Sequence, residues 1–240
     1  MGAQWKHAGR IQNSSKRGAL ISKLVKEIMV AAKSGTPDIE HNHRLRAAVE
    51  AAKKQSVPRD NIDRAIKRGA GLLNETVNFE TILYEGFAPH RVPVIVECLT
   101  DNKNRTAADI RILFRKGQLG SIGSVNWMFD RMGVIEGTHA QKGMDIESAA
   151  IEAGAQNVEP LESSEVPAGS TGARFFCETT DLDSVNKALI EAGWTITLFE
   201  LSYIAKSFTE LGDEEKKEVG DFLTAIDDHD DVHRVYAALR

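Results

Sequence analysis

Residues 79–117, "FETILYEGFAPHRVPVIVECLTDNKNRTAADIRILFRKG", decide the fold. Residues 79–87 and 92–100 are rich in β-branched and other apolar side chains, and the Ala-Pro-His-Arg turn between them predicts a pair of strands. An amphipathic helix is expected from Arg105 onward, with one side facing a core. The side chains predicted to point inward are Ala108, Ile112 and Leu113. The stretch therefore predicts the order strand, strand, helix.

This order needs further elements to complete a domain. Residues 124–130, "SVNWMFD", are expected to form a third strand. A helix and a strand that complete the unit are predicted near the end of the sequence, at 213–227 and 231–239. Residues 132–206 lie between these parts. Their predicted order of strand, helix, strand, strand, helix and strand is the split βαβ pattern of ferredoxin-like sandwiches. The third domain is thus expected to interrupt the second.

The N-terminal third is predicted to be helical. Residues 16–33 repeat apolar side chains at intervals of three and four, and Asn42 is a good N-cap for a second helix. Pro58 suits the first turn of a third helix, which Gly69 is expected to cap. The predicted fold class is α+β: an N-terminal three-helix domain followed by two ferredoxin-like α+β domains, the third inserted in the second. The expected domains are 1–72, 73–131 plus 207–240, and 132–206.

Charge is distributed unevenly along the chain. The whole sequence has a net charge of −5, but residues 1–72 hold 15 Lys+Arg against 6 Asp+Glu, and residues 73–240 hold 15 against 29. The local net charges are +9 and −14. A one-signed excess across several helices suits contact with phosphates, whereas mixed signs are typical of an ordinary solvated surface. The basic third predicts nucleic-acid binding. The acidic part is expected to bind nucleic acid poorly and to offer a surface to a protein partner.

The polar residues 101–106 admit three interpretations: a catalytic loop, a phosphate-binding loop, or a turn that caps a helix. No His or Cys nucleophile lies nearby in the sequence, and no phosphate-loop or dinucleotide spacing is present. Capping by Asn104 or Asp101 is therefore favoured. The glycine-rich residues 116–124 also lack phosphate-loop spacing, and we expect a helix end followed by a loop.

Other polar and aromatic residues receive plainer interpretations. His229 and His233 stand among four Asp residues, but a helix is expected to give way to a strand there, which favours a solvated acidic turn over a metal site. Trp127 and Trp194 are expected in the core. Both cysteines lie in apolar strand-like runs, which is typical of reduced, buried thiols in the cytoplasm.

Several of these segments resemble the YebC family, which includes transcriptional regulators and mitochondrial translational activators of cytochrome oxidase. The likeness runs nearly end to end, through "VPRDNIDRAIK", "YEGF", "TDNKNRTAADIR", "GSVNWMFDRMGVIE" and "DDVHRVY". The resemblance implies a three-domain cytoplasmic protein without catalysis, and we expect no cofactor, metal or membrane partner. The chain departs from the family at residues 88–91, where the family has a glycine-rich turn.

The resemblance leaves two functions open. One is a DNA-binding transcriptional regulator, which we favour; the other is a ribosome-associated translation factor that binds ribosomal RNA. Both need a basic surface on a phosphate backbone, so charge does not separate them. A protein–protein interaction module built on the acidic domains is an alternative of another class. The candidate nucleic-acid-binding residues are Lys6, Arg10, Lys16, Arg17, Lys23, Arg44, Arg46, Lys53, Lys54, Arg59, Arg64, Lys67, Arg68, Lys103 and Arg105.

Overall fold

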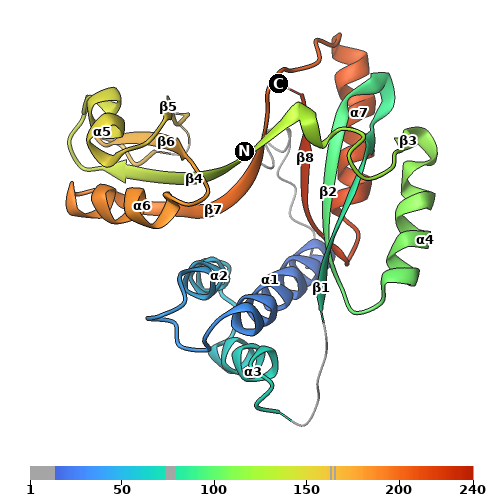
Figure 1. The fold of residues 1–240 in the computed structure, drawn as a ribbon, viewed down its shortest axis with the longest axis horizontal. Coiled ribbons are helices and arrows are strands. Elements are labelled where there is room, and N and C mark those ends of the chain that lie inside the picture. The colour runs from blue at the N-terminus through green and yellow to red at the C-terminus, as the bar shows by residue number, and fades with distance from the viewer. Residues whose placement is uncertain (1–13, 74–78, 163, 165, 240) are drawn as a thin grey trace. The chain divides into compact units, whose positions relative to one another are not determined.

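The computed structural model describes residues 14–73, 79–162, 164 and 166–239. Three N-terminal helices are followed by two α+β domains, which confirms the predicted fold class (Figure 1). The chain divides into two compact units: residues 131–204 form one, and residues 1–130 together with 205–240 form the other. The finer boundary at residue 72 stays a prediction. Within the described ranges, no helix is long and apolar enough to cross a membrane.

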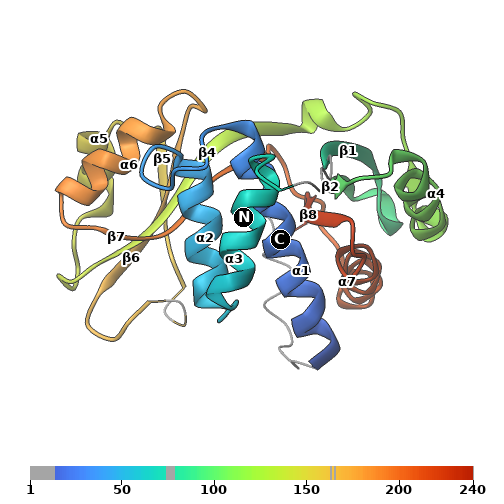
Figure 2. The same ribbon diagram turned by 90° about the horizontal axis from the view of Figure 1, so that it is seen from below.

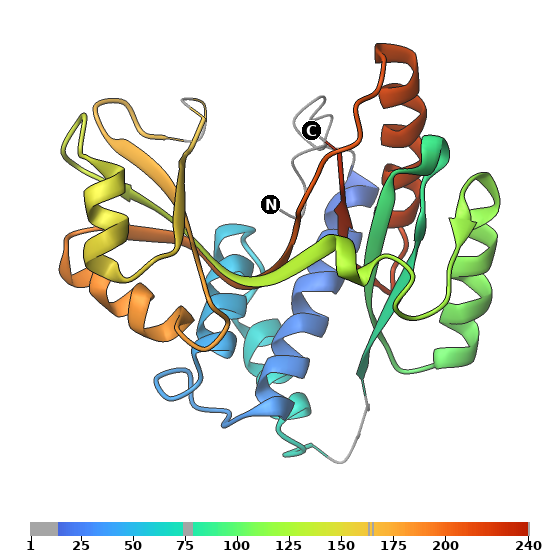
Figure 3. The same ribbon diagram turned by 45° about the horizontal axis from the view of Figure 1, so that its top comes forward.

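The three N-terminal helices pack around a small apolar core (Figure 3). They are α1 (Ser14–Ser34), α2 (His43–Lys54) and α3 (Arg59–Gly69). Asn42 is the predicted N-cap of α2, and its side-chain oxygen accepts a hydrogen bond from the Leu45 amide at 3.0 Å. Its amide group also donates to the Ala31 carbonyl at 2.9 Å, so the cap ties α2 to the end of α1. The fully buried side chains include Ile28, Leu45 and Val49.

Gly69 has a different role from the one predicted. The C-cap of α3 is Ala70, and Gly69 is the last residue of the helix itself. A Cβ at Gly69 would lie 2.2 Å from the carbonyl oxygen of Met29 in α1. Glycine is therefore needed here because the two helix backbones approach each other closely, not because the helix must end.

The larger unit contains a four-stranded sheet in the order β3-β1-β2-β8, whose paired strands are antiparallel. Its elements are β1 (Glu80–Phe87), β2 (Pro93–Thr100), α4 (Lys103–Leu113), β3 (Gln118–Leu119), α7 (Asp213–Asp227) and β8 (Val232–Ala237). The last helix and strand thus return to the sheet begun by β1, as expected. Helices α4 and α7 pack on the same face (Figure 2), where their apolar side chains meet those of β2 and β8.

Two local predictions in this unit are wrong. Residues 124–128 do not form a strand: Asn126–Met128 is a 3-10 helix, and only Phe129 and Asp130 of the predicted strand are extended, where they begin the next strand. The short β3 takes the edge position of this sheet instead. The buried side of α4 carries Thr106 and Ile110, whereas Ala108 and Ile112 are exposed and Leu113 is half-buried. The helix therefore buries a different side from the one predicted, and the polar contacts of Thr106 described below give the reason.

The turn between β1 and β2 contains two residues in the left-handed region. His90 has φ 59° and Arg91 has φ 61°, and neither is a glycine. Glycine adopts such angles without steric cost. This gives a physical reason for the glycine-rich turn that the YebC family has at the place of residues 88–91 of this chain. In this chain the His90 ring contacts the carboxylates of Glu218 at 2.8 Å and Glu215 at 3.5 Å, both on α7. These contacts offset part of the backbone strain.

The smaller unit follows the predicted strand and helix order. It comprises β4 (Phe129–His139), α5 (Ile146–Ala153), β5 (Asn157–Pro160), β6 (Thr171–Cys177), α6 (Leu182–Glu191) and β7 (Thr195–Ala205), with β4 and β7 each running slightly beyond the unit. The strand order β5-β6-β4-β7 is the ferredoxin-like arrangement. Helices α5 and α6 cover a core that includes Phe175 and Trp194. Trp194 is buried as predicted, and both cysteines are free and buried.

The packing at Gly69 gives a stability prediction with a control in the same bundle. Gly69→Ala should destabilise the protein by about 1 to 3 kcal/mol, because the added methyl group forces α1 and α3 apart. Gly18 lies in α1 with nothing within 4 Å of its Cβ position. Gly18→Ala should stabilise by about 0.5 to 1 kcal/mol through helix propensity. Urea unfolding of both variants checks the pair, and equal effects would contradict the close approach.

Candidate nucleic-acid interface

Helices α2 and α3 carry a local excess of exposed positive charge. Residues 43–69 hold eight Lys+Arg against three Asp+Glu, a local net charge of +5. Amphipathic helices that bury Leu45, Ile62 and Ala65 leave the intervening basic positions on the outside. The exposed basic residues are Arg44, Lys53, Lys54, Arg59, Arg64 and Lys67.

Helix α3 presents its charges unequally. Arg64 and Lys67 are exposed and line a shallow hollow with Asp60, Asp63 and Leu73. Arg68, the third candidate residue in this part of α3, is half-buried and so presents less of its side chain to a ligand than Arg64 and Lys67 do. The Arg59 side chain is 93% exposed and lies 3.8 Å from the Asp63 carboxylate. Such a surface pair is weak, and it leaves the guanidinium able to exchange partners.

Other candidate residues are already engaged inside the protein. Lys23 is only 13% exposed in its side chain, and its ammonium donates to the Asp227 carbonyl. Arg46 donates to the Ile39 and Glu40 carbonyls. Lys53 is exposed but contacts the Glu50 carboxylate at 2.8 Å. The side chains of Lys6, Arg10, Lys16 and Arg17 lie outside the part of the chain that the structure describes.

The polar stretch after β2 begins a helix, as expected, but with a different cap. Helix α4 starts at Lys103, and the side-chain oxygen of Asn102 accepts from the Arg105 amide at 3.1 Å. Asn104 lies within the first turn instead of capping it. The Thr100 hydroxyl accepts from the Asn102 amide at 2.9 Å, so the end of β2 also fixes the position of the cap.

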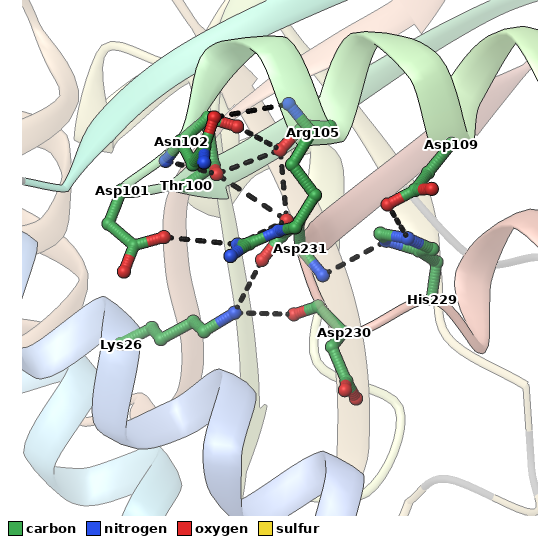
Figure 4. Close-up of polar contacts among 10 residues, drawn as sticks. Lys26, Thr100, Asp101, Asn102, Arg105, Asp109, His229, Asp230 and Asp231 are labelled. Atoms are coloured by element: carbon green, nitrogen blue, oxygen red, sulfur yellow. Dashed lines mark hydrogen bonds and ion pairs between the residues drawn. The ribbon is translucent and has the colours of Figure 1, made fainter.

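Asp231 is the centre of a polar network that includes Lys26, Thr100, Arg105 and Thr106, and we refer to these five residues as the Asp231 network. Figure 4 shows Asp231 with Lys26, Thr100 and Arg105 around it. One carboxylate oxygen contacts the Lys26 ammonium at 2.9 Å. The other accepts from Arg105 at 3.0 Å and from the Thr106 hydroxyl at 2.9 Å. The network joins α1, β2, α4 and the turn before β8. It explains why Thr106 occupies the buried side of α4.

The electrostatics of Asp231 follow from this geometry. Its side chain is 4% exposed, so the predicted solvated acidic turn is wrong at this residue. Burial raises the pKa of Asp231, but hydrogen bonds from Lys26, Arg105 and Thr106 outweigh burial, and the pKa falls to about 2. The carboxylate is therefore charged at neutral pH. Its charge is balanced by cations from two helices.

The network changes how the polar stretch is interpreted. Arg105 is committed to Asp231 and also contacts Asp101 at 3.0 Å, while Lys103 pairs with Glu80 at 2.5 Å. Their contacts are intramolecular, so in this structure neither cation is free of a carboxylate partner. The sequence drew attention to residues 101–106, which include Arg105 and Thr106. It did not predict the burial of Asp231, because a polar residue before a predicted strand has no local signal for burial.

A second carboxylate joins the helices to the sheet. Glu27 of α1 contacts Arg234 at 3.2 Å and His233 at 3.5 Å, both in β8. Burial raises the pKa of Glu27, but the hydrogen bond from His233 and the nearby charges of His233, Arg234 and Arg44 lower the pKa to about 2. Helix α1 thus contacts the β8 side through charges of both signs, Lys26 to Asp231 and Glu27 to Arg234.

The glycine-rich loop is a third place where the sequence suggested phosphate binding. Glu85 of β1 is 7% exposed and accepts hydrogen bonds from the amides of Gly123, Val125 and Asn126, at 2.8 to 2.9 Å. Burial raises the pKa of Glu85, but these amides outweigh it and lower the pKa. The amides that a phosphate would use are therefore occupied by a protein carboxylate, in agreement with a structural loop.

Neither histidine of the acidic turn takes part in a metal site within the described ranges. The Nδ1 atom of His229 accepts from the Asp231 amide at 3.1 Å, so its Nε2 atom donates to the Asp109 carboxylate at 3.3 Å. His233 contacts Glu27. Across the described residues, no group of three or more His, Cys, Asp or Glu side chains is arranged to hold a metal ion.

Comparison with known proteins places these features in a family. The family model for the TACO1/YebC protein N-terminal domain matches residues 3–72, and the model for the TACO1/YebC second and third domain matches residues 79–239. A Pseudomonas syringae pv. syringae protein named "Probable transcriptional regulatory protein" is 55% identical, covering 100% of this chain and 99% of its own. A Bdellovibrio bacteriovorus protein named in the same way is 50% identical, covering 100% of both.

A solved structure agrees with the fold. The crystal structure of a conserved hypothetical protein from Aquifex aeolicus has a TM-score of 0.82 and 37% sequence identity, and the alignment covers 99% of this chain and 96% of that one.

The Asp231 network predicts a large difference between two aspartates that share one arginine. Asp231→Asn should destabilise the protein by about 2 to 3 kcal/mol, because it leaves Lys26 and Arg105 without a buried counter-charge. Asp101 is 45% exposed and also contacts Arg105. Asp101→Asn should cost less than about 1 kcal/mol. Urea unfolding at neutral pH measures both, and similar losses would show that burial of Asp231 does not matter.

The lowered pKa values of Asp231 and Glu27 predict acid sensitivity. Both values are about 2 in the folded protein, below the usual 3.8 and 4.5. These carboxylates therefore stabilise the fold above their unfolded pKa values, and the stabilisation is lost as the pH falls from about 5 toward 2. Asp231→Asn should show a shallower decline than the parent over this range. Asp101→Asn should keep the parental decline, and a parental decline in Asp231→Asn would contradict the assignment.

Proposed function

This chain belongs to the TACO1/YebC family, and we propose that it is a nucleic-acid-binding regulatory protein whose favoured ligand is DNA, in a role in transcription. The names of the relatives from Pseudomonas syringae and Bdellovibrio bacteriovorus support the regulatory role. The observation that carries the proposal is the set of exposed basic side chains on α2 and α3, with a local net charge of +5.

The physical basis is release of counterions from the phosphate backbone. Each Lys or Arg that neutralises a phosphate releases condensed cations, which favours binding at low salt. Rigid helices hold the charges in fixed positions, and few local carboxylates compete for them. The proposal includes no catalytic step and needs no cofactor. A ribosome-associated factor that binds ribosomal RNA would use the same contacts, so the test includes both ligands.

Removing three exposed cations from α3 tests whether this basic surface contacts nucleic acid. The triple variant Arg59→Ala, Arg64→Ala, Lys67→Ala should lower the slope of log affinity against log salt by about 3 units if each residue contacts a phosphate. Affinity should fall about equally for all sequences, since phosphate contacts do not read bases. Arg68 is left unchanged because it is half-buried. Titrations of duplex DNA and of ribosomal RNA at several salt concentrations measure the effect.

A charge-matched control comes from the acidic part of the chain. Lys142, Lys187 and Lys217 are exposed and lie outside the basic helices. Their replacement by Ala removes the same charge and should leave the salt slope unchanged. Equal losses in the two triple variants would indicate only a net-charge effect. A full loss on RNA with little change on DNA would favour the translation factor.

A further inference from the structure

The loop of residues 120–128, which we call the Glu85 loop, holds two large apolar side chains in solvent. Ile122 is 93% exposed and Trp127 is 65% exposed. Trp127 was predicted to lie in the core, and that prediction is wrong. Trp194 shows the usual alternative for this residue type in the same chain, since it is 3% exposed in the core of the smaller unit.

The exposure of these side chains is fixed by the structure of the loop. The Glu85 carboxylate accepts from three amides of the loop, and the side chain of Val125 in the same loop is fully buried. The Trp127 indole nitrogen donates to the Ser124 carbonyl at 3.2 Å, which satisfies the ring's polar group and orients the ring. An aromatic ring held in place before a ligand arrives loses little entropy on binding.

Positive charge precedes this loop in the sequence and lies at the adjoining sheet edge. Residues 111–129 hold Arg111, Arg115 and Lys116 and no Asp or Glu, although residues 73–240 have a net charge of −14. All three cations are exposed. No ion pair links them to another residue in the part of the chain that the structure describes.

Strand pairing brings another cation to this edge. Gln118 of β3 pairs with Phe87 of β1, and a Cβ at Gly117 would lie 2.3 Å from the Phe87 carbonyl. Lys116 and the turn that contains Arg91 therefore lie at the same end of the sheet. The Glu85 loop starts two residues after Gln118, where the Gly120 amide donates to the Glu85 carbonyl at 2.8 Å. The edge thus combines exposed cations with a fixed aromatic ring.

We propose that this edge binds a single-stranded segment of nucleic acid, with an unpaired base stacked on Trp127 and phosphates near Arg115, Lys116 and Arg91. Cations that follow the backbone and an aromatic ring that stacks on a base are the two components of single-strand binding. The inference rests on the proposed function and adds a ligand class to it. The net charge of residues 73–240 does not reveal this edge, because acidic residues elsewhere in that range outnumber its cations.

A protein ligand is the other occupant that an exposed Trp and Ile would suit. The absence of acidic residues from 111–129 favours a polyanion, and a base offers a flat face that matches a fixed indole. We therefore assign the edge to nucleic acid, and binding of a protein is one outcome that the experiment distinguishes.

The experiment uses the full-length chain and a fluorescein-labelled oligouridine of about 12 nucleotides, a length within the usual range of single-strand sites. Binding is measured by anisotropy, and a fully paired RNA duplex of the same length is the second probe. Trp127→Ala should weaken oligouridine binding about 10-fold, whereas Trp127→Phe, which keeps a stacking ring, should weaken it by less than about 3-fold. Duplex binding should not change in either variant.

Two further variants complete the test. Arg115→Ala with Lys116→Ala should lower the salt slope for oligouridine by about 2 units. Ile190 is 53% exposed on α6 and serves as the control, so Ile190→Ala should leave binding of both probes unchanged. Thermal unfolding of Trp127→Ala should match the parent, because the side chain contributes little to the core.

The outcomes separate this inference from the proposed function. Parental oligouridine binding in Trp127→Ala would overturn the stacking assignment, and so would an equal loss on single strand and duplex. A parent that binds duplex but not oligouridine would also overturn the inference while leaving the proposed function standing. A parent that binds neither probe, nor DNA, would overturn both. Retained oligouridine binding together with loss of ribosome co-sedimentation in Trp127→Ala would assign the edge to a protein contact.

Discussion

The buried carboxylate of Asp231 is the contact on which the arrangement of the larger unit depends. It accepts from Lys26 of α1, and from Arg105 and Thr106 of α4, while its own backbone carbonyl accepts from the Leu99 amide of β2. Four segments that are far apart in the sequence therefore meet at one side chain. A buried charge is costly unless it is fully paired, so these segments must be present together for the carboxylate to be stable. This requirement joins the C-terminal strand to the helices at the start of the chain.

Features set by local sequence were predictable. The three N-terminal helices follow from apolar spacing, and Asn42 was identified as a cap because its side chain bonds an amide three residues away. The return of the last helix and strand to the first sheet was also predictable, because the elements in residues 79–130 do not by themselves complete a domain. Features set by distant contacts were not predictable. Thr106 is buried because it bonds Asp231, 125 residues away, and the apolar pattern of α4 contains no trace of that contact.

The same distinction explains the candidate site. Sequence counting treats every Lys and Arg as equal, but the structure divides them into two groups. Lys23, Lys26 and Arg105 neutralise or bond groups inside the protein, whereas Arg64 and Lys67 remain exposed on α3. Trp127 shows the converse case. Its exposure depends on Glu85, whose distance of 38 to 41 residues from the loop amides hides the contact from any local pattern.

The internal cations also determine how binding data on this protein can be interpreted. Replacing Lys26 or Arg105 removes a positive charge and weakens the Asp231 network at the same time, so a loss of nucleic-acid affinity would not identify a phosphate contact. Replacing Arg64 or Lys67 removes charge from an exposed helix face without removing a buried partner. The two classes are expected to differ in unfolding free energy even where they agree in affinity. Stability measured beside affinity therefore separates residues that build the scaffold from residues that contact the ligand, and this separation applies equally whether the ligand is DNA or RNA.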